Sequence, residues 1–431
     1  MPYGDNDWLA LTQETTLEPN LPICDPHHHF WDFRDVRIPY QRYLLDELNA
    51  DVYSGHNIRS TVFIETRSMY KPDGPDDLKP VGEIEFVQGL AAASASGIYG
   101  PTRAAAAIIG NGNLNLGEKV QSVLESLKLA SPNRFQGIRQ PCGWDPNPDV
   151  ETRAPEQQLA NANFRKGAQV LANMGLSLDI TVYFHQLEEL ADFAKFVPNL
   201  TIILNHIGGL YRIGPYANKD NEVLPHWREG IRKVSECDNI VLKLGGIGQP
   251  RYGFLWHTYN KPISSETLSD ELAPLINYCI DQFTPARCMF ESNFPPDKVS
   301  YSYNILFNAF KLLSKQYSDK ERADLFHDTA TRIYKITALI FKSVKNKYKK
   351  ETTMAFFRLY TDENGTSQME ELDLASTPDL TTLHEATKAI FRSSESGYFS
   401  DWHNAPRRQY IITLSGPVSY THLTLPTTPY V

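Results

Sequence analysis

The feature that most constrains the fold of this chain is a repeated alternation of short apolar runs with amphipathic segments, which begins near residue 21 and continues to about residue 336. The apolar runs are mostly continuous, as is typical of strands that are covered on both faces. Eight such runs predict eight strands, at Leu21–Asp25, Ser60–Thr66, Arg103–Gly110, Phe135–Gln140, Leu176–Tyr183, Leu200–His206, Ile240–Gly246 and Cys288–Phe294.

The segments between these runs predict helices, because their apolar residues recur at steps of three and four. The expected helices are Glu83–Ser96, Leu116–Leu129, Glu156–Asn173, Leu187–Phe196, Pro225–Glu236, Ser265–Phe283, Tyr303–Gln316 and Ser318–Ile336. Strands that alternate with helices in this way predict an α/β fold of the (β/α)8 TIM barrel type. A doubly wound open sheet is the alternative, but the glycine-rich turn that often follows the first strand of such a sheet is missing here.

The chain outside this repeat divides into four parts. Residues 1–20 are polar and predict a poorly packed N-terminal arm ahead of the barrel at 21–336. Residues 337–353 are basic and low in complexity, which indicates a linker. Residues 354–417 resemble part of a small, incomplete cupin-like β segment. Residues 418–431 resemble the translation of a sequencing adapter, which indicates a non-native tail, although a genuine two-domain protein stays an alternative.

Charge and composition exclude several classes of partner. The formal charge is −9, and no basic patch with interleaved aromatic residues is found, so we expect no nucleic-acid partner. No apolar run reaches the roughly 18 residues of a membrane span. The cysteines are scattered without a C-x-x-C pair, which favours a reducing, cytoplasmic location. We expect a small-molecule substrate and leave a homo-oligomer open.

A histidine-rich stretch follows the first apolar run. His27 and His29 are two residues apart, so on an extended strand both side chains point to the same face. Two imidazoles on one face can share a metal ion or bind an anionic substrate. The alternatives are a purification tag, which is not typical of an internal run of three histidines, and a structural histidine cluster.

Polar side chains also stand at the ends of seven of the eight expected strands, where a TIM barrel places its active site. They are His27 and His29, Glu65 and Arg67, Arg139, His185, His206, Lys243, and Glu291 with Asn293.

Five motifs in this order resemble one known family. They are D-x-H-x-H-F-W-D from Asp25, F-x-G-I-R from Phe135, His185-Gln186-Leu187, Asn205-His206-Ile207-Gly208-Gly209, and the run from Arg287 to Pro295. The chain resembles the amidohydrolase superfamily and, within it, the amidohydrolase 2 branch of metal-dependent TIM-barrel hydrolases and decarboxylases.

The resemblance implies a divalent metal, usually zinc, held by His27, His29 and His185 with His206 beside them. It also implies that Arg139 could hold a substrate carboxylate in a bidentate manner. The metal would polarise a carbonyl and lower the pKa of a bound water, and a carboxylate at the last strand would accept the proton of that water.

One position departs from the pattern of this family. The family places an aspartate where this chain has Asn293, and asparagine cannot act as a general base. Glu291, two residues earlier, would share the face of Asn293 on a strand and could replace the aspartate. The alternatives are a site with weak or no metal, in which the histidines, Arg139 and Lys243 polarise the substrate, and an inactive relative.

Each candidate also has a structural interpretation. His185 could cap the following helix, and His206 could be the core residue of a tight turn. Lys243 could pair with a carboxylate such as Glu65, and Arg67 could be a solvated loop charge. Trp31 could form an apolar wall of the site.

Together these observations predict a hydrolase that acts on a lactone or another small carboxylated cyclic ester. In this prediction Glu291, His206 and Asn293 are catalytic, while Arg139, Lys243 and Trp31 bind the substrate. The alternatives are a non-oxidative decarboxylase of an aromatic-type acid on the same barrel and a non-catalytic small-molecule binding protein.

Overall fold

The computed structural model describes residues 5–32, 40–336, 355–361, 367–372 and 410–413. The chain forms two compact units, Met1–Ala338 and Leu339–Val431. The first unit is the barrel, and the second is a three-stranded antiparallel sheet. The predicted linker at 337–353 and the tail at 418–431 lie outside the described residues.

The barrel is built from eight parallel strands whose order in the sheet follows their order in the chain. They are β1 (Pro22–His28), β2 (Asn57–Ile64), β3 (Arg103–Asn111), β4 (Phe135–Pro141), β5 (Ser177–Thr181), β6 (Ile202–Leu204), β7 (Ile240–Gly245) and β8 (Cys288–Glu291). A parallel bridge between His28 and Phe294 brings the last strand back to the first. This order confirms the predicted (β/α)8 barrel and excludes the doubly wound sheet, whose strand order reverses at a switch point.

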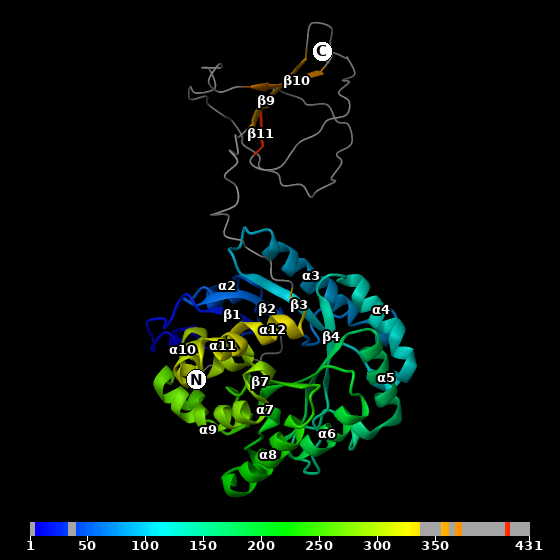
Figure 1. Ribbon diagram of the computed structural model, residues 1–431, viewed down its shortest axis with the longest axis vertical. Helices are drawn as coiled ribbons and strands as arrows, with labels where there is room; N and C mark the ends of the chain where they lie inside the picture. Colours follow the sequence, from blue (N-terminus) through cyan, green and yellow to red (C-terminus); the bar gives the residue numbers. More distant parts are fainter. Residues whose placement is uncertain (1–4, 33–39, 337–354, 362–366, 373–409, 414–431) are drawn as a thin grey trace. The chain divides into compact units, whose positions relative to one another are not determined.

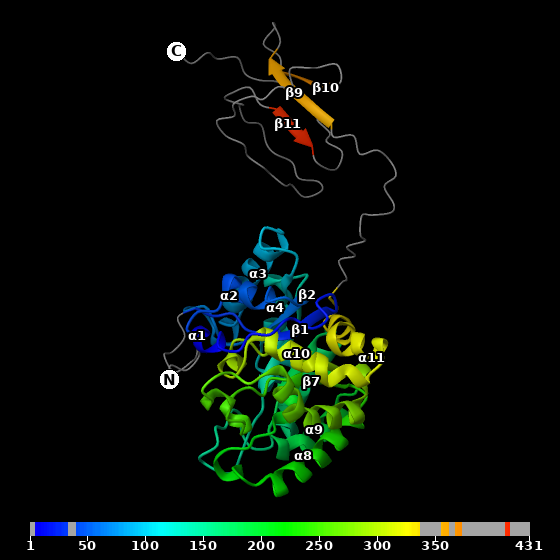
Figure 2. The same ribbon diagram turned by 90° about the vertical axis from the view of Figure 1, so that its left-hand side faces the viewer.

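Helices surround the strands on the outside (Figures 1 and 2). They are α1 (Asn6–Leu9), α2 (Leu45–Val52), α3 (Val81–Ala95), α4 (Val120–Ala130), α5 (Ala162–Asn173), α6 (Leu187–Phe196), α7 (His206–Gly209), α8 (Asp220–Ser235), α9 (Ser265–Phe283), α10 (Tyr303–Leu313), α11 (Asp319–Ala323) and α12 (Thr329–Ile333). The predicted bounds of α6 and α9 are confirmed. The helix that we expected from Glu156 begins later because Asn161 caps α5, and a π-helical turn at Asp324–Asp328 divides the last predicted helix.

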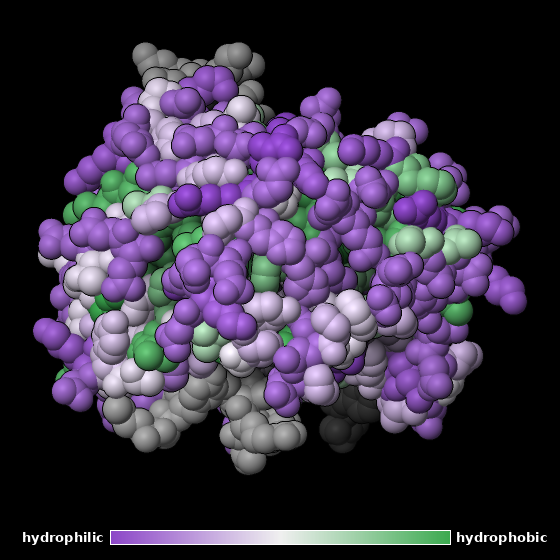
Figure 3. Space-filling model, turned by 90° about the horizontal axis from the view of Figure 1, so that it is seen from below, coloured by the Kyte–Doolittle hydropathy of each residue, from purple (hydrophilic) through white to green (hydrophobic). Residues whose placement is uncertain are grey.

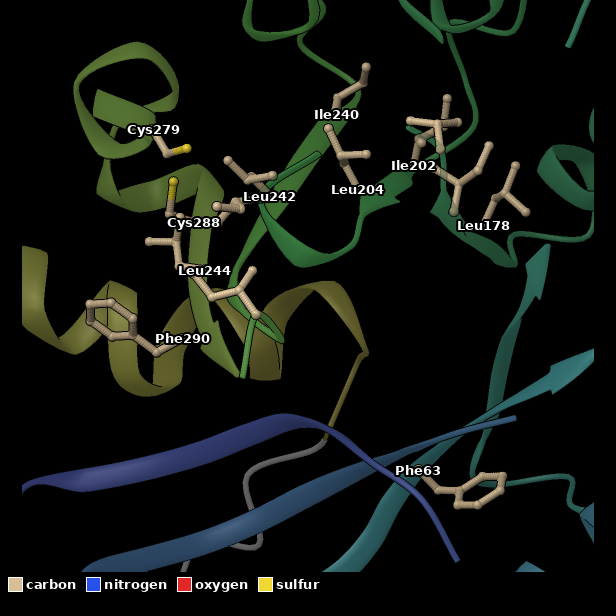
Figure 4. Packing of buried hydrophobic residues seen from close by; sticks show 14 of the residues in the cluster. Phe63, Leu178, Ile202, Leu204, Ile240, Leu242, Leu244, Cys279, Cys288 and Phe290 are labelled. Carbon is tan, nitrogen blue, oxygen red and sulfur yellow. The ribbon is translucent and has the colours of Figure 1, made fainter. Parts of the chain in front are cut away.

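The alternation of side chains along β7 and β8 separates the outer core from the barrel interior. Leu242, Leu244 and Phe290 point outward toward the helices (Figure 4), and the Phe290 ring stacks on Phe310 of α10 with 4.4 Å between centroids. Each such fully buried side chain contributes roughly 1.5–3 kcal/mol. Their neighbours, Lys243 and Glu291, are therefore directed into the barrel.

The N-terminal arm, which we expected to be poorly packed, contacts the barrel closely. Lys311 of α10 donates hydrogen bonds to the carbonyl oxygens of Leu17 and Glu18, at 2.7 and 3.0 Å. The side-chain oxygen of Asn308 accepts from the Leu17 amide at 2.9 Å. The sequence expectation was wrong for this part of the arm, because polar side chains of α10 bind its backbone groups in place of water.

The second unit contains β9 (Ala355–Thr361), β10 (Ser367–Leu372) and β11 (Tyr410–Thr413), in the order β10-β9-β11. Both pairs of strands are antiparallel. The cupin-like character of residues 354–417 stays a prediction.

The face of the molecule seen in Figure 3 is mainly polar. On the face shown in Figure 3, apolar residues occur in small scattered groups among hydrophilic ones. Among the described residues, the search for a helix with the length and apolarity of a membrane span found none. All five cysteines are buried and free, as expected from their spacing.

Candidate active site

The seam between β1 and β8 is closed by a buried carboxylate. Asp25 accepts hydrogen bonds from the amide and hydroxyl of Ser292, at 3.0 and 2.6 Å, and from the Tyr303 hydroxyl at 2.9 Å. Burial raises the pKa of Asp25 to about 6, although these hydrogen bonds oppose the shift. Asp25 therefore fixes the two chain segments that carry His27, His29, Glu291 and Asn293.

Glu291 lies between two imidazoles in the interior of the barrel. Its Oε1 accepts from His206 Nδ1 at 2.8 Å, and its Oε2 lies 2.6 Å from His27 Nδ1. Burial alone would raise the pKa of Glu291, but the charges and hydrogen bonds of His206 and the charge of Lys243 outweigh burial and lower it. The carboxylate is thus ionised at neutral pH and can stabilise positive charge on His206.

His206 is positioned by a left-handed turn at the end of β6. The backbone of His206, Ile207, Gly208 and Gly209 has positive φ throughout, from 46 to 75°. Side chains rarely adopt this conformation, and Ile207 is strained by it because its side chain is β-branched. The indole of Trp227 in α8 donates to the Ile207 carbonyl at 2.7 Å and holds the turn in place.

Gly246 supports the other side of the His206 ring. A Cβ atom at this glycine would lie 1.8 Å from His206 Nδ1 and 2.5 Å from its Cε1. The Nδ1–Cε1 edge of the ring is thus enclosed by Gly246 and Glu291. Because a carboxylate can only accept, Nδ1 carries the proton, and Nε2 is the nitrogen with a free lone pair.

Asn293 lies beyond the end of β8 and has a φ of 53°. This turn ends the strand alternation, so Asn293 does not share the face of Glu291 as the sequence predicted. Its Nδ2 donates to Asp297 at 2.7 Å, and its Oδ1 lies 3.3 Å from His29 Nε2. The sequence pattern did not single out Asp297, which is four residues further on and fully buried.

His29 and Asn293 present two lone pairs to each other. His29 Nδ1 lies 2.8 Å from the Ile64 carbonyl, which can only accept, so the proton is on Nδ1 and Nε2 is an acceptor. Burial, followed by the charge of Arg139, lowers the pKa of His29 well below its ordinary value, so the ring is neutral. An acceptor pair of this kind is satisfied by a cation or by a donor from a bound molecule.

Arg139 on β4 is engaged by the protein itself. Its Nε donates to Glu65 at 2.8 Å, its Nη2 donates to the Glu65 carbonyl, and its Nη1 lies 3.3 Å from His27 Nε2. The fork that we predicted for a substrate carboxylate is therefore largely occupied, while Nη1 brings positive charge to the face of His27.

A cavity of about 420 Å³ opens above these groups. Its lining includes His29, His206, Asn293 and Arg139, together with Trp31. The Trp31 indole stacks on His29 with 6.0 Å between ring centroids and donates to the Tyr40 carbonyl. This volume is typical of a small-molecule site.

One predicted site residue, His185, lies outside this group, and another, Lys243, contacts the group without lining the cavity. His185 Nε2 contacts Asp145 at 2.9 Å, and its ring packs near Phe184 and Tyr216, away from His27 and His29. Lys243 is buried in the barrel and pairs with Asp179 at 2.8 Å rather than with Glu65, and its Nζ lies 3.3 Å from His27 Nδ1. Neither His185 nor Lys243 lines the cavity. Arg67, which the sequence predicted to be a solvated loop charge, is exposed and also lines the cavity.

The residues present fit a divalent cation in two ways. The ligand atoms of His27, His206 and Glu291 lie within 4.8 Å of one another, and Glu291 Oε2 is buried without a hydrogen-bond partner. The acceptor atoms of His29 and Asn293 form the second group, and the His27 ring lies edge-on to the His29 ring with 5.0 Å between centroids. Neutral imidazole and carboxylate or amide oxygen are suitable ligands for such an ion.

Comparison with known proteins gives a consistent result. A sequence model described as Amidohydrolase matches residues 24–336. An uncharacterised protein of Sinorhizobium fredii, y4mH, is 27% identical over 330 residues, which cover 74% of this chain and 99% of that protein. An L-fucono-1,5-lactonase of Burkholderia multivorans is 22% identical, covering 72% of this chain and 95% of the lactonase.

Among solved structures, an amidohydrolase from Burkholderia multivorans with bound zinc is 22% identical with a TM-score of 0.56. The match covers 73% of this chain and 99% of that structure. At this identity the likeness supports the barrel fold alone.

Proposed function

The chain belongs to the amidohydrolase family, whose members are hydrolases or decarboxylases, and we propose that it hydrolyses a lactone or another small carboxylated cyclic ester. The observation that carries this proposal is the pair of His206 and Glu291 at the floor of the cavity. An imidazole whose Nδ1–H is held by an ionised carboxylate is arranged as a general base.

The proposed reaction begins with a water molecule in the cavity. His206 Nε2 accepts one proton of this water as its oxygen bonds to the ring carbonyl carbon, and Glu291 stabilises the imidazolium through Nδ1–H. The ring C–O bond then breaks, and His206 returns the proton to the departing ring oxygen. The product is an open hydroxy acid. Glu291 is thus a positioning residue that acts through His206. The sequence instead predicted that Glu291 acts directly on the water.

Polarisation of the carbonyl is the second requirement. Arg139 Nη1 is a cationic donor that lines the cavity beside His27, and Glu65 holds the guanidinium in place. A substrate carbonyl oxygen that lies near Arg139 Nη1 and His29 would become an oxyanion during the reaction, and the positive charge of the guanidinium would stabilise it.

A divalent ion, zinc in our proposal, would be held by His27, His29 and Asn293. We prefer this set because the hydrogen bond from His206 Nδ1 already occupies one oxygen of Glu291, whereas the acceptor atoms of His29 and Asn293 face each other without a donor between them. Burial lowers the pKa of both His27 and His29 well below the ordinary range, so protons do not compete with a metal there. When bound, the ion would supply Lewis-acid polarisation of the carbonyl.

The relatives support the choice of a lactone and of zinc only by likeness. The L-fucono-1,5-lactonase matches over most of the barrel, and the solved amidohydrolase contains zinc. We also propose a cytoplasmic location, in line with the five free buried thiols.

The test is a panel of sugar and simple lactones, with acid release followed by a pH indicator. We expect His206→Gln to lower kcat by about 10²- to 10⁴-fold, the range of a lost general base. His185→Gln should stay within about twofold of the wild type, because that residue lies outside the cavity. Release of carbon dioxide from a hydroxybenzoate-type acid would favour a decarboxylase, and ligand binding without any turnover would favour a binding protein. Either result would overturn the proposal.

A further inference from the structure

Asn205, which stands between β6 and His206, has a buried amide oxygen without a partner. The residue is 1% exposed, and it lines the cavity together with His206. Its Oδ1 accepts no hydrogen bond from any of the residues that the structure describes. A buried acceptor that stays unpaired costs about 1–3 kcal/mol, so an unpaired oxygen on a residue that lines a cavity indicates a donor from a bound molecule.

The direction of this oxygen is set by the other end of the same amide. Asn205 Nδ2 donates to Asp179 Oδ1 at 3.0 Å and lies 3.4 Å from the Ile203 carbonyl oxygen. Asp179 is ion-paired with Lys243 at 2.8 Å, so its carboxylate is an acceptor, as the carbonyl is. Turning the amide over would place acceptors against each other. Nδ2 is therefore fixed toward the barrel interior, and Oδ1 is directed away from Asp179.

Backbone hydrogen bonds fix Asn205 and His206 relative to each other. The Asn205 amide donates to the Ile180 carbonyl of β5 at 3.0 Å, and the His206 amide donates to Glu291 Oε1 at 3.2 Å. The two side chains leave adjacent points of a chain that is held on both sides. Consecutive residues in the lining of one cavity thus supply two acceptors, His206 Nε2 and Asn205 Oδ1.

We propose that Asn205 is a catalytic residue that holds the attacking water through its Oδ1. A water molecule has two protons, and the proposed reaction transfers only one of them, to His206 Nε2. The second proton stays on the oxygen that bonds to the carbonyl carbon, and Asn205 Oδ1 accepts a hydrogen bond from it. With both protons held, a lone pair of the water is directed at the carbonyl carbon. The inference deepens the proposed function and rests on it.

Methanol as the nucleophile separates this role from a structural one. Its single hydroxyl proton passes to His206 as its oxygen bonds to the carbonyl carbon. The ring C–O bond then breaks, the ring oxygen takes the proton back from His206, and the product is the methyl ester of the open hydroxy acid. A methyl group replaces the second proton of water, so this reaction does not use Asn205 Oδ1. Loss of Asn205 should therefore slow attack by water more than attack by methanol.

The test is the ratio of methyl ester to hydroxy acid, measured by NMR at early times with added methanol, on the lactone that the wild type hydrolyses fastest. In Asn205→Ala we expect kcat for hydrolysis to fall by about 10-fold, the effect of one hydrogen bond, and the ratio to rise by about the same factor. Asn205→Ser keeps a hydroxyl that can donate to Asp179 but has no amide oxygen. It should give the same rise in the ratio, which separates the effect from loss of the Asp179 contact.

The matched control is Asn239→Ala. Asn239 Nδ2 donates to the carbonyl oxygens of Ala194, Val197 and Leu200, at 3.2, 3.1 and 3.1 Å, and Asn239 does not line the cavity. This variant also loses the hydrogen bonds of a structural asparagine, but it should keep the product ratio of the wild type.

The possible results distinguish the two proposals. A product ratio that is unchanged in both Asn205→Ala and Asn205→Ser, in an enzyme that hydrolyses the lactone, would overturn the inference and leave the proposed function in place. An equal rise in Asn239→Ala would also overturn the inference, because lost stability alone would then explain the ratio. A wild type that forms neither acid nor methyl ester from any lactone would overturn the proposed function, and the inference with it.

Discussion

Replacing Gly246 by alanine perturbs the candidate general base without changing any polar group. The new Cβ would lie 1.8 Å from His206 Nδ1, a separation that carbon and nitrogen never adopt without a bond. The His206 ring must therefore move, and its 2.8 Å contact with Glu291 must lengthen or break. We expect kcat for the hydrolysed lactone to fall by about 10²- to 10⁴-fold, as for loss of the base itself.

The substitution also has a conformational cost that must be separated from the clash. Gly246 has a φ of 67°, where an alanine costs about 1–2 kcal/mol. Overpacking against the ring adds about 1–3 kcal/mol. The free energy of unfolding, measured by urea denaturation, should therefore fall by about 2–5 kcal/mol.

Gly175 is the matched control. Its φ is 66°, and the nearest atom that a Cβ would meet is Lys335 Nζ at 3.8 Å, an ordinary contact. Gly175→Ala should lose only the conformational 1–2 kcal/mol and should keep the wild-type kcat. If Gly246→Ala lost no more activity than Gly175→Ala, the assignment of His206 as the base would be wrong.

Three further predictions test the neighbouring groups. Asn293→Asp should raise the affinity for zinc by at least about 10-fold in a competition with a chromogenic chelator, because a carboxylate would then face His29; unchanged affinity would contradict our ligand set. Glu291→Gln should lower kcat by about 10²-fold and weaken the dependence of the rate on pH in the neutral range, whereas an unchanged profile would refute the pairing with His206. Burial, and then the charge of Glu65, raises the pKa of Glu83 to about 8. As pH rises from 4.5 to 8, the free energy of unfolding of the wild type should therefore fall relative to that of Glu83→Gln, by on the order of 1 kcal/mol per pH unit. Urea titrations in which the difference between the two proteins stays constant across this range would contradict the shift.

The sign of the Glu83 effect follows from where the proton is held. Between pH 4.5 and 8 the folded protein keeps a proton on Glu83 that the unfolded chain has released, so its contribution to stability is complete below 4.5 and is lost by pH 8. Glutamine resembles the protonated form and keeps the acceptor for Thr66 and Ser68. The variant should therefore lack this slope while retaining the loop that carries Arg67.

The barrel was predictable because its signal is periodic. Continuous apolar strands and helices with three- and four-residue repeats depend only on burial, and each strand meets its sequence neighbour in the sheet. The same logic placed His27, His206 and Glu291 at strand ends, where the barrel brings them together. His185 follows a strand as well, but the 3₁₀ turn at Phe184–Gln186 directs it to Asp145 instead. A residue must therefore stand at a strand end to reach the site, but this position alone does not determine where its side chain points.

What the sequence could not show depends on backbone turns that break the two-residue alternation of a strand. A φ of 53° at Asn293 sends its amide toward His29 and Asp297 while Glu291 faces the opposite imidazoles, so the two residues do not substitute for one another. No rule of strand periodicity predicts a left-handed asparagine, and none reaches Asp297, which is four residues away. The carboxylate that the family pattern led us to expect beside His29 is therefore replaced by a neutral amide that Asp297 holds from behind. This arrangement leaves His206, rather than a carboxylate, as the candidate base that lines the cavity in our proposal.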